Sequence, residues 1–470
     1  MSAPMLLLSE AARILGVPFS GVDAEVLRVS TDSRAIRPGD LFIALRGEKF
    51  DGGAFAAQAL RQNAVGVVLD HTQAPDIAAA LRVDDTRLAL GKLAAAWRAR
   101  FTLPLVAITG SNGKTTVKEM LAAILREETG LRVEAGSDAA VLNTEGNLNN
   151  DIGLPLMLLR LRDTHQFAVL EMGMNHAGEI AYLTGLAQPD VAVVINALTA
   201  HIGFLGSVEN IARAKGEIFA GLSASGIAVF NADDAHAELW REQNAQRPVV
   251  DFGLKAASKV HGHFEPTAFG AALTITLPNG TLEVTLQVPG EHNVMNALAA
   301  AATAWALDIG HGSIVAGLSG FTGVKGRLQR KPALHGSTFI DDTYNANPDS
   351  VKAALSVLAQ QPGKKLLVLG DMGELGVDAA AMHAEMGLAA RAAGVDKLLA
   401  LGDLSKETVA AFGAGAMHFE RIQELLAELE NALTPATTVL VKGSRFMQME
   451  RVVNSFMEAP VGLPAGAQGH

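Results

Sequence analysis

The chain has 470 residues, of which 49% are hydrophobic and 19% charged, so it is long and apolar enough for two or three folded domains and is not globally disordered. Cysteine is absent, which excludes disulfides, iron–sulfur clusters and cysteine nucleophiles and leaves a hard ion such as Mg²⁺ as the expected metal. The net charge of −11 argues against a general nucleic-acid or anionic-membrane binder.

The first residues, MSAPMLLLSEAARILG, predict the start of an amphipathic helix and not a signal peptide, because a basic region is missing and Glu10 interrupts the apolar run. No stretch reaches the roughly 18 apolar residues of a membrane span, so we expect a cytoplasmic protein without stable membrane insertion. Strand-like runs then alternate with alanine-rich helical stretches, at Leu27–Ser30, Leu41–Leu45 and Val65–Leu69. This alternation predicts a small α/β domain over residues 1–84.

A larger strand–helix alternation covers residues 85–318 and predicts a mainly parallel sheet covered by helices. Its strand candidates are Leu105–Thr109, Phe167–Met172, Val191–Asn196 and Ile227–Asn231. Between residues 272 and 288 the pattern changes to period two on both sides of an Asn-Gly pair, which is a strong hairpin signal. The alanine-rich helix HNVMNALAAAATAWAL follows the hairpin.

Residues 319–458 show a third alternation and predict another α/β domain. Its strand candidates are Thr338–Asp341, Lys365–Leu369, Lys397–Leu401 and Thr438–Val441. The tail 459–470 is of low complexity, and we expect it to be disordered.

The strongest local signal is the turn between a strand and a helix, with the sequence Gly110-Ser111-Asn112-Gly113-Lys114-Thr115-Thr116. Backbone N–H groups in a glycine-bearing turn, together with the positive end of the following helix, suit phosphate oxygens. Lys114 would reach the β- and γ-phosphates of a nucleotide, and Thr115 would offer its hydroxyl to Mg²⁺. Ile108 stands where the usual pattern has its first glycine, so a turn that only caps the helix is the alternative.

Glu171 ends the next strand candidate, where a carboxylate can coordinate Mg²⁺ beside the phosphate loop or simply cap the following helix. His201 follows the strand after that, at the same rim of the sheet, and a structural hydrogen-bond donor is its alternative. Lys215 lies on the apolar stripe of its helix, where burial would depress its pKa and let the neutral amine react with CO₂ to a carbamate. The alternative for Lys215 is a lysine that reaches the helix edge.

Three asparagine-rich segments suit a base, a ribose or a sugar, and suit caps and Asx turns equally well. The first contains Asn147, Asn149 and Asn150, the second opens a helix with His292, Asn293 and Asn296, and the third runs from Asp341 to Pro348.

Together and in this order, the segments resemble the Mur ligase family over nearly the whole chain. The motifs are TGSNGKTT (109–116), GNLNNDIGLP (146–155), EMGMNHAGEI (171–180), NALTAHIGFLGS (196–207), ARAKGEIF (212–219), GEHNVMNALAA (290–300), GRLQ (326–329), DDTYNANPDS (341–350), LGDMGELG (369–376) and KGSRFMQME (442–450). NLNNDIG, YNANP, GDMGELG and KGSR resemble the members that add D-alanyl-D-alanine, and the DNPR motif of the diaminopimelate-adding members is missing.

The resemblance implies a three-domain α/β architecture: an N-terminal domain for the UDP end of the substrate, a central P-loop ATPase domain on a mainly parallel sheet and a Rossmann-like C-terminal domain. It implies an ATP-dependent ligase that makes an acyl phosphate of UDP-N-acetylmuramoyl-tripeptide and joins it to D-alanyl-D-alanine for peptidoglycan synthesis. The third residue of the tripeptide, diaminopimelate or lysine, stays open. A monomer that binds no nucleic acid is expected.

The resemblance also implies which residues bind each part of the substrates. The UDP-sugar pocket would contain Thr31, Asp32, Ser33, Arg34, Arg46 and Asp51. Two Mg²⁺ ions would be held by Thr115, Glu171, His201 and a carbamylated Lys215. ATP would contact residues 110–116, with His292, Asn293 and Asn296 at the adenine side, Arg327 at the phosphates and Asp341 at the ribose. The remaining substrate contacts would come from Asn147, Asn149, Asn150, Tyr344, Asn345, Asn347, Lys442 and Arg445.

Two alternatives remain. A folylpolyglutamate-type ligase shares the GKT loop and the GxHNxxNxLAA motif, but the TDSR unit at residues 31–34 and the NLNND loop disfavour it. A non-catalytic nucleotide switch is disfavoured by the intact Lys114, Thr115, Glu171 and His201. A dehydrogenase is not expected, because no G-x-G-x-x-G follows a strand candidate.

Overall fold

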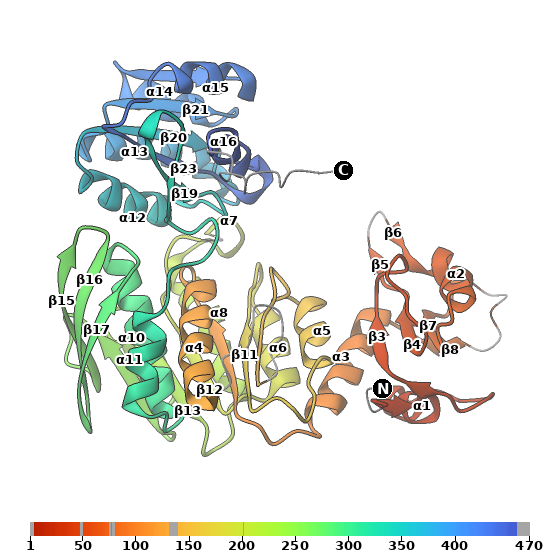
Figure 1. Cartoon of the computed structure of the whole chain (residues 1–470). Helices are drawn as coiled ribbons and strands as arrows, with labels where there is room; N and C mark the ends of the chain where they lie inside the picture. Colours follow the sequence, from red (N-terminus) through yellow and green to blue (C-terminus); the bar gives the residue numbers. More distant parts are fainter. Residues whose placement is uncertain are drawn as a thin grey trace, which may run out of the picture.

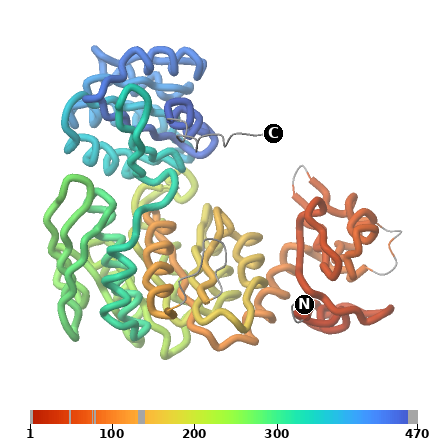
Figure 2. The backbone as a smooth tube through the Cα atoms, in the orientation of Figure 1, coloured from red at the N-terminus to blue at the C-terminus, as the bar shows by residue number. Residues whose placement is uncertain are grey.

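The computed structural model describes residues 4–47, 50–74, 77, 80–130, 140–200 and 202–457. His201 and the predicted tail 459–470 therefore lie outside the described residues. Figure 1 shows an N-terminal unit, a middle unit and a C-terminal unit, each built around its own main sheet. The tube in Figure 2 shows the C-terminal unit above one end of the middle unit and the N-terminal unit at its side.

The N-terminal unit is built on a four-stranded parallel sheet of order β3-β4-β7-β8. Every residue of β4 and β7 is buried, as expected for parallel strands with both faces covered. Its strands are β1 (Leu6–Leu7), β2 (Glu25–Val26), β3 (Arg28–Ser30), β4 (Asp40–Ile43), β5 (Arg46–Gly47), β6 (Phe50–Asp51), β7 (Gly66–Asp70) and β8 (Ala80–Val83). Its helices are α1 (Leu8–Leu15) and α2 (Ala56–Arg61), and α3 (Thr86–Arg98) leads into the middle unit.

The middle unit contains a nine-stranded sheet of order β10-β11-β9-β12-β13-β14-β15-β16-β17. The pairings from β10 to β15 are parallel, and those of β16 and β17 are antiparallel. The strands are β9 (Leu105–Thr109), β10 (Val141–Asn143), β11 (Phe167–Glu171), β12 (Val191–Val194), β13 (Ile227–Asn231), β14 (Val249–Gly253), β15 (Val260–Thr267), β16 (Gly270–Leu277) and β17 (Gly280–Leu286).

Helices cover both faces of the middle sheet, and the buried faces of α4 and α10 belong to one apolar core. The helices are α4 (Lys114–Thr129), α5 (Gly153–Leu158), α6 (Glu179–Ala187), α7 (Ile202–Leu205), α8 (Val208–Gly216), α9 (Ala237–Gln243), α10 (Glu291–Ala306) and α11 (His311–Ser319). Of the helices in the described part of the chain, none has the length and hydropathy that crossing a membrane requires.

The C-terminal unit has a six-stranded sheet of order β18-β19-β23-β20-β21-β22, parallel except for the edge strand β18. The first helix of this unit, α12, has a capping box between Asn347 and Ser350, and Pro348 occupies its first turn. The strands are β18 (Gln329–Pro332), β19 (Thr338–Asp342), β20 (Lys364–Gly370), β21 (Lys397–Leu401), β22 (Ala416–Phe419) and β23 (Thr437–Lys442). The helices are α12 (Pro348–Ala359), α13 (Ala379–Ala392), α14 (Ser405–Phe412), α15 (Ile422–Glu430) and α16 (Glu450–Ser455).

The predicted α/β class with mainly parallel sheets is confirmed. The predicted hairpin is present as β16 and β17, but it does not form a sheet of its own. β15 pairs with β14 on one side and with β16 on the other, so the hairpin extends the middle sheet. β15 was not predicted because its sequence, VHGHFEPT, has few apolar residues and no clear alternation.

Two glycines meet where the C-terminal unit contacts α7 of the middle unit. The Gly203 nitrogen donates a hydrogen bond to the carbonyl of Glu374 (3.3 Å). A Cβ at Gly203 would lie 2.6 Å from the nitrogen of Gly376, and a Cβ at Gly376 would lie 2.9 Å from the Cα of Gly203. The two backbones therefore touch at a place where only glycine fits on both sides.

We expect Gly203→Ala to separate the C-terminal unit from the middle unit. The added methyl would collide with backbone atoms, which costs about 1–3 kcal/mol when the surroundings cannot move, and a rigid-body opening relieves the clash. Small-angle X-ray scattering should show a larger radius of gyration than in the unchanged protein. Gly312→Ala on α11 is the control, because a Cβ at Gly312 meets no atom within 4 Å; equal radii for Gly203→Ala and Gly312→Ala would contradict the prediction.

Candidate active site

A cavity of about 1250 Å³ lies between the carboxyl edge of the middle sheet and the C-terminal unit. It brings together most of the residues that the sequence predicts for the nucleotide and for the second substrate. Its wall includes Ser111, Asn112, Gly113, Lys114, Thr115, Thr116, Asn147, Asn149, Asn150, Glu171, His292, Asn293, Asn296, Arg327, Tyr344, Asn345, Asn347, Lys442 and Arg445. Gly110, Lys215 and Asp341 are not part of this wall, and His201 is outside the described residues.

The phosphate loop, residues 110–116, joins β9 to α4 and presents the N-terminus of a 16-residue helix to the cavity. Gly113 has φ of +88°, and a Cβ there would lie 2.4 Å from Oδ1 of Asn296, so this position requires glycine. The Lys114 ammonium folds back over the loop and donates to the Gly110 carbonyl (2.5 Å). Burial lowers the pKa of Lys114 to about 8, and the charge of Glu171 opposes that shift.

Glu171 ends β11 as a buried carboxylate beside the phosphate loop. Its Oε2 lies 3.4 Å from the Thr115 hydroxyl, and its Oε1 is buried without a hydrogen-bond partner among the described residues. The Lys118 ammonium lies 3.7 Å from Oε1 and donates to the carbonyl of Thr144. A carboxylate oxygen that has no hydrogen bond and lies beside a hydroxyl fits a Mg²⁺ ion. Within the described part of the chain no three acidic or histidine side chains gather into a metal cluster, so phosphate or water oxygens would have to complete such a site.

Lys215 is on α8, and only 1% of its surface is exposed. Burial, reinforced by the charge of Lys114, brings the pKa of Lys215 well below its usual value. Among the described residues, none accepts a hydrogen bond from its ammonium group or forms an ion pair with it. The predicted position on the buried face of the helix is thus confirmed, and the environment suits a neutral amine.

Arg327 extends from the segment between the middle and C-terminal units to the phosphate loop. Its guanidinium donates to the Thr115 hydroxyl (3.3 Å) and stacks on the ring of Tyr344, 4.2 Å from the ring centre. Its Nε is buried and has no hydrogen-bond partner among the described residues. A half-buried guanidinium whose Nε has no hydrogen bond, next to a phosphate loop, suits an anionic ligand.

The start of α10 forms the other side of the phosphate loop. Asn293 donates to the carbonyl of Pro289 (2.7 Å), and Asn296 donates to Oδ1 of Asn293 (3.1 Å). Burial lowers the pKa of His292 to about 4, so its imidazole is neutral at neutral pH.

The C-terminal unit places Asp342 in the cavity wall, next to the predicted ribose ligand Asp341, which is not in the wall. Asp341 accepts hydrogen bonds from Lys331 (2.6 Å) and from Thr343. Asp342 accepts one from the Lys442 ammonium (2.5 Å) in a buried pair between neighbouring strands. The ribose role of Asp341 and the substrate role of Lys442 stay predictions.

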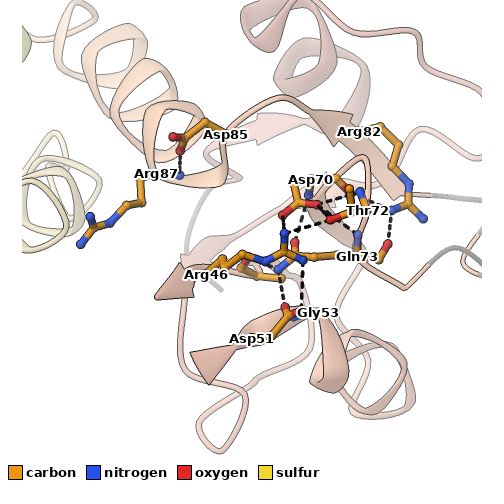
Figure 3. Close-up of polar contacts among 10 residues, drawn as sticks. Arg46, Asp51, Gly53, Asp70, Thr72, Gln73, Arg82, Asp85 and Arg87 are labelled. Carbon is orange, nitrogen blue, oxygen red and sulfur yellow. Dashed lines mark hydrogen bonds and ion pairs between the residues drawn. The ribbon is translucent and has the colours of Figure 1, made fainter. Parts of the chain in front are cut away.

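The six residues predicted for the UDP-sugar form two groups, both near the carboxyl edge of the N-terminal sheet. Figure 3 shows Arg46 between two carboxylates, 3.1 Å from Asp51 and 3.1 Å from Asp70. Thr31 and Asp32 line a separate cavity of about 390 Å³. Arg160 and Arg162 of the middle unit line the same cavity.

The second group also includes Ser33 and Arg34. Ser33 is buried, whereas Arg34 is exposed and paired with Asp32. The side-chain hydrogen bonds from Arg34 lower the pKa of Asp32 to about 2. All six substrate roles stay predictions.

Contacts between the two larger units were not predicted. Asn112 of the phosphate loop exchanges two side-chain amide hydrogen bonds with Asn347 (2.8 and 3.4 Å), and Asp349 accepts from the backbone and the hydroxyl of Thr199. Glu374 also lines the cavity. Its motif, LGDMGELG, was noted in the sequence, but nothing in the spacing indicated which surface it faces.

Three family models match the chain: the Mur ligase middle domain over residues 108–304, the Mur ligase glutamate ligase domain over residues 326–445 and the Mur ligase catalytic domain over residues 25–98. The chain is 42% identical over 455 residues to the UDP-N-acetylmuramoyl-tripeptide–D-alanyl-D-alanine ligase of Escherichia coli (strain K12), with 96% of this chain and 98% of that protein aligned.

Two solved structures extend the likeness. MurF from Acinetobacter baumannii has a TM-score of 0.88 at 37% identity, covering 96% of this chain and 99% of that one. MurF from Thermotoga maritima, solved in complex with ADP, has a TM-score of 0.81 at 28% identity, covering 91% and 96%.

Proposed function

The chain belongs to the Mur ligase family, and from this premise we propose that it joins D-alanyl-D-alanine to UDP-N-acetylmuramoyl-tripeptide, with ATP as the phosphoryl donor. The observation that carries the proposal is the nearly complete alignment with proteins that bear this ligase's name. The products are UDP-N-acetylmuramoyl-pentapeptide, ADP and phosphate, and the reaction belongs to peptidoglycan precursor synthesis.

The cavity suits a reaction in two steps. The terminal carboxylate of the tripeptide attacks the γ-phosphorus of ATP and forms an acyl phosphate, and the amine of the dipeptide then displaces phosphate. The protein's task is to hold the reactants in line and to neutralise the charge on the phosphoryl oxygens. We assign the neutralisation of charge to Lys114 and Arg327, two cations of the cavity wall, because both contact residues of the phosphate loop. No covalent nucleophile of the enzyme is required.

Thr115 and Glu171 are the described residues that would hold Mg²⁺, and His201 is the further ligand that the resemblance implies. When bound, Mg²⁺ would neutralise charge on the nucleotide phosphates. We propose two such ions and a carbamylated Lys215 as an additional oxygen ligand. The buried amine supports the carbamate, because only the neutral form reacts with CO₂.

The remaining roles are assigned by place. His292, Asn293 and Asn296 would meet the base of ATP and Asn147, Asn149 and Asn150 the other substrates, as the resemblance implies; all six line the cavity, which supports these roles. The N-terminal unit would hold the UDP end, and the C-terminal unit the dipeptide. A monomer in the bacterial cytoplasm and the domain boundaries 84/85 and 318/319 also stay predictions.

Phosphate release tests the function directly. With ATP, Mg²⁺ and UDP-N-acetylmuramoyl-tripeptide, we expect sustained phosphate release only when D-alanyl-D-alanine is added, together with a product whose mass has increased by the dipeptide less one water. Release with folate and glutamate, but not with these substrates, would favour a folylpolyglutamate-type ligase. ATPase activity that did not respond to either substrate would favour a nucleotide switch.

A further inference from the structure

Next to the candidate metal site lies a lysine–glutamate pair that the reaction described above does not use. Lys118 and Glu119 are on α4, just beyond the phosphate loop, and neither is part of the cavity wall. Lys118 is three residues after Thr115, so the two side chains leave the same side of the helix, about one turn apart. The inference that follows rests on the proposed function, because it concerns the Mg²⁺ ion of that reaction.

The ammonium group of Lys118 lies among three oxygen atoms. The Lys118 side chain is buried, and its ammonium group donates to the carbonyl of Thr144 (2.5 Å). It also forms an ion pair with Oε1 of Glu119 (2.7 Å). The third oxygen, Oε1 of Glu171, is 3.7 Å away, which is too far for a hydrogen bond. Lys118 therefore acts on the Glu171 carboxylate by its charge and leaves the lone pairs of Oε1 available to another ligand.

Two carboxylates compete for this one ammonium group. The ion pair with Glu119 is 1.0 Å shorter than the approach to Glu171 (2.7 against 3.7 Å). A lysine beside one carboxylate normally closes to about 2.7–2.9 Å, because a charge-assisted hydrogen bond is strong where water is excluded. Without Glu119, a movement of about 1 Å would bring Nζ of Lys118 into such a bond with Glu171.

The two groups that hold the ammonium are themselves fixed by the end of strand β10. Oε2 of Glu119 accepts from the side-chain amide of Asn143 (3.2 Å), the last residue of β10. Thr144 follows and is buried, and its hydroxyl accepts from the backbone nitrogen of Glu171 (2.8 Å). Glu119 and Thr144 are thus tied to the same strand ends that carry Glu171, and their positions are set within the protein.

A hydrogen bond from Lys118 to Glu171 would oppose the binding of a divalent cation. The ammonium group would occupy a lone pair of the carboxylate, and Mg²⁺ binds through carboxylate oxygens. It would also bring a positive charge closer to the metal and repel it. The other oxygen of Glu171, Oε2, lies 3.4 Å from the Thr115 hydroxyl, so the metal would lie between Glu171 and the phosphate loop.

We propose that Glu119 is a positioning residue for the metal site, which holds the Lys118 ammonium away from Glu171 so that the Glu171 carboxylate stays available to Mg²⁺. Lys118 in turn balances part of the charge of the two carboxylates, and this lets Glu171 be buried before the metal binds. The pair acts through Glu171 and contacts neither the nucleotide nor the metal.

The test measures the binding of Mn²⁺ alone, because Mn²⁺ takes the same oxygen ligands as Mg²⁺ and the electron paramagnetic resonance signal of free Mn²⁺ reports binding without turnover. In Glu119→Ala we expect the dissociation constant for Mn²⁺ to rise by about tenfold, since Lys118 then closes onto Glu171. Glu128→Ala is the matched control, because Glu128 is an exposed carboxylate in the last turn of the same helix. Its dissociation constant should stay within about twofold of that of the unchanged protein.

A second substitution separates positioning from structural damage. In the double variant Glu119→Ala/Lys118→Met the competing cation is gone, so the dissociation constant for Mn²⁺ should return to that of the unchanged protein or fall below it. Damage to the fold by Glu119→Ala would not be repaired by a further substitution in the interior. A double variant that melts cooperatively but binds Mn²⁺ as weakly as Glu119→Ala would overturn the inference, and so would an unchanged constant in Glu119→Ala.

A crystal structure of Glu119→Ala without metal decides the question even where the double variant does not fold. We expect Nζ of Lys118 within about 3 Å of Oε1 of Glu171; an ammonium group that stays at its present distance would overturn the inference. An unchanged protein that binds no Mn²⁺ would overturn the candidate metal site and this inference with it. Failure of the proposed function would be recognised separately, as an unchanged protein that binds Mn²⁺ but releases no phosphate in response to the dipeptide.

Discussion

Replacing Lys114 by alanine is expected to lower kcat/KM for dipeptide-dependent phosphate release by on the order of 10³-fold, the range seen when a preorganised charge is removed from a transition state. Lys114 is the first residue of α4, and its ammonium group lies over the turn that the nucleotide phosphates would enter. Its own contacts in this structure are two carbonyls of the loop, of Gly110 and Ser111, so its removal breaks no ion pair.

The melting temperature of Lys114→Ala should therefore remain close to that of the unchanged protein, which separates a loss of catalysis from a loss of folding. Lys352→Ala is the control, because Lys352 is a lysine of the C-terminal unit whose exposed ion pair with Glu385 contributes little. ADP release near the normal rate in Lys114→Ala, with both substrates present, would refute the assignment of the phosphate loop.

Lys215→Met is expected to lower the rate of ligation by about 10²-fold or more, because a metal site that neutralises charge would be lost. The stability of the protein should not fall. Lys215 is a fully buried amine without a hydrogen-bond partner among the described residues, and methionine fills a similar volume without a polar group. Burial places the pKa of Lys215 in the folded protein well below its usual value of 10.5. Between these two values the unfolded chain binds more protons than the folded one.

The Lys215 amine should consequently make the free energy of unfolding of the unchanged protein increase with pH, up to about pH 10.5. Lys215→Met should lack this contribution. Melting temperatures recorded from pH 7 upward measure the difference. Removal of dissolved CO₂ should lower the rate of ligation by the unchanged protein. Added bicarbonate should restore the rate of the unchanged protein but not that of the variant. Lys92→Met, at an exposed lysine of α3, is the control; normal turnover by Lys215→Met would contradict the carbamate.

Much of the fold could be predicted because its main strands are buried on both faces. Runs such as Leu105–Thr109 and Lys397–Leu401 are continuous apolar segments between helical periods, and they occur as β9 and β21 at the same residues. Short or polar strands were missed. β10 has three residues, and β15 lies at the change from parallel to antiparallel pairing, where only its neighbours in the sheet make it a strand.

The sequence by itself determined the local parts of the candidate site. A strand, a glycine turn and a helix follow one another without a break in the phosphate loop, and the helical period alone placed Lys215 on a buried face. These features depend on backbone geometry over a few residues, which the order of residue types specifies.

Only the tertiary structure decided which distant side chains meet. It paired Asn112 with Asn347, and it placed Glu374 in the same cavity wall as the phosphate loop. It also placed Arg46 between Asp51 and Asp70, in a group apart from the cavity that Thr31 and Asp32 line. Such contacts depend on how whole units dock and on which way a loop turns at positions such as the left-handed Glu374. Hydrophobic periodicity carries no information on either, because it records which face of an element is buried and not which partner buries it.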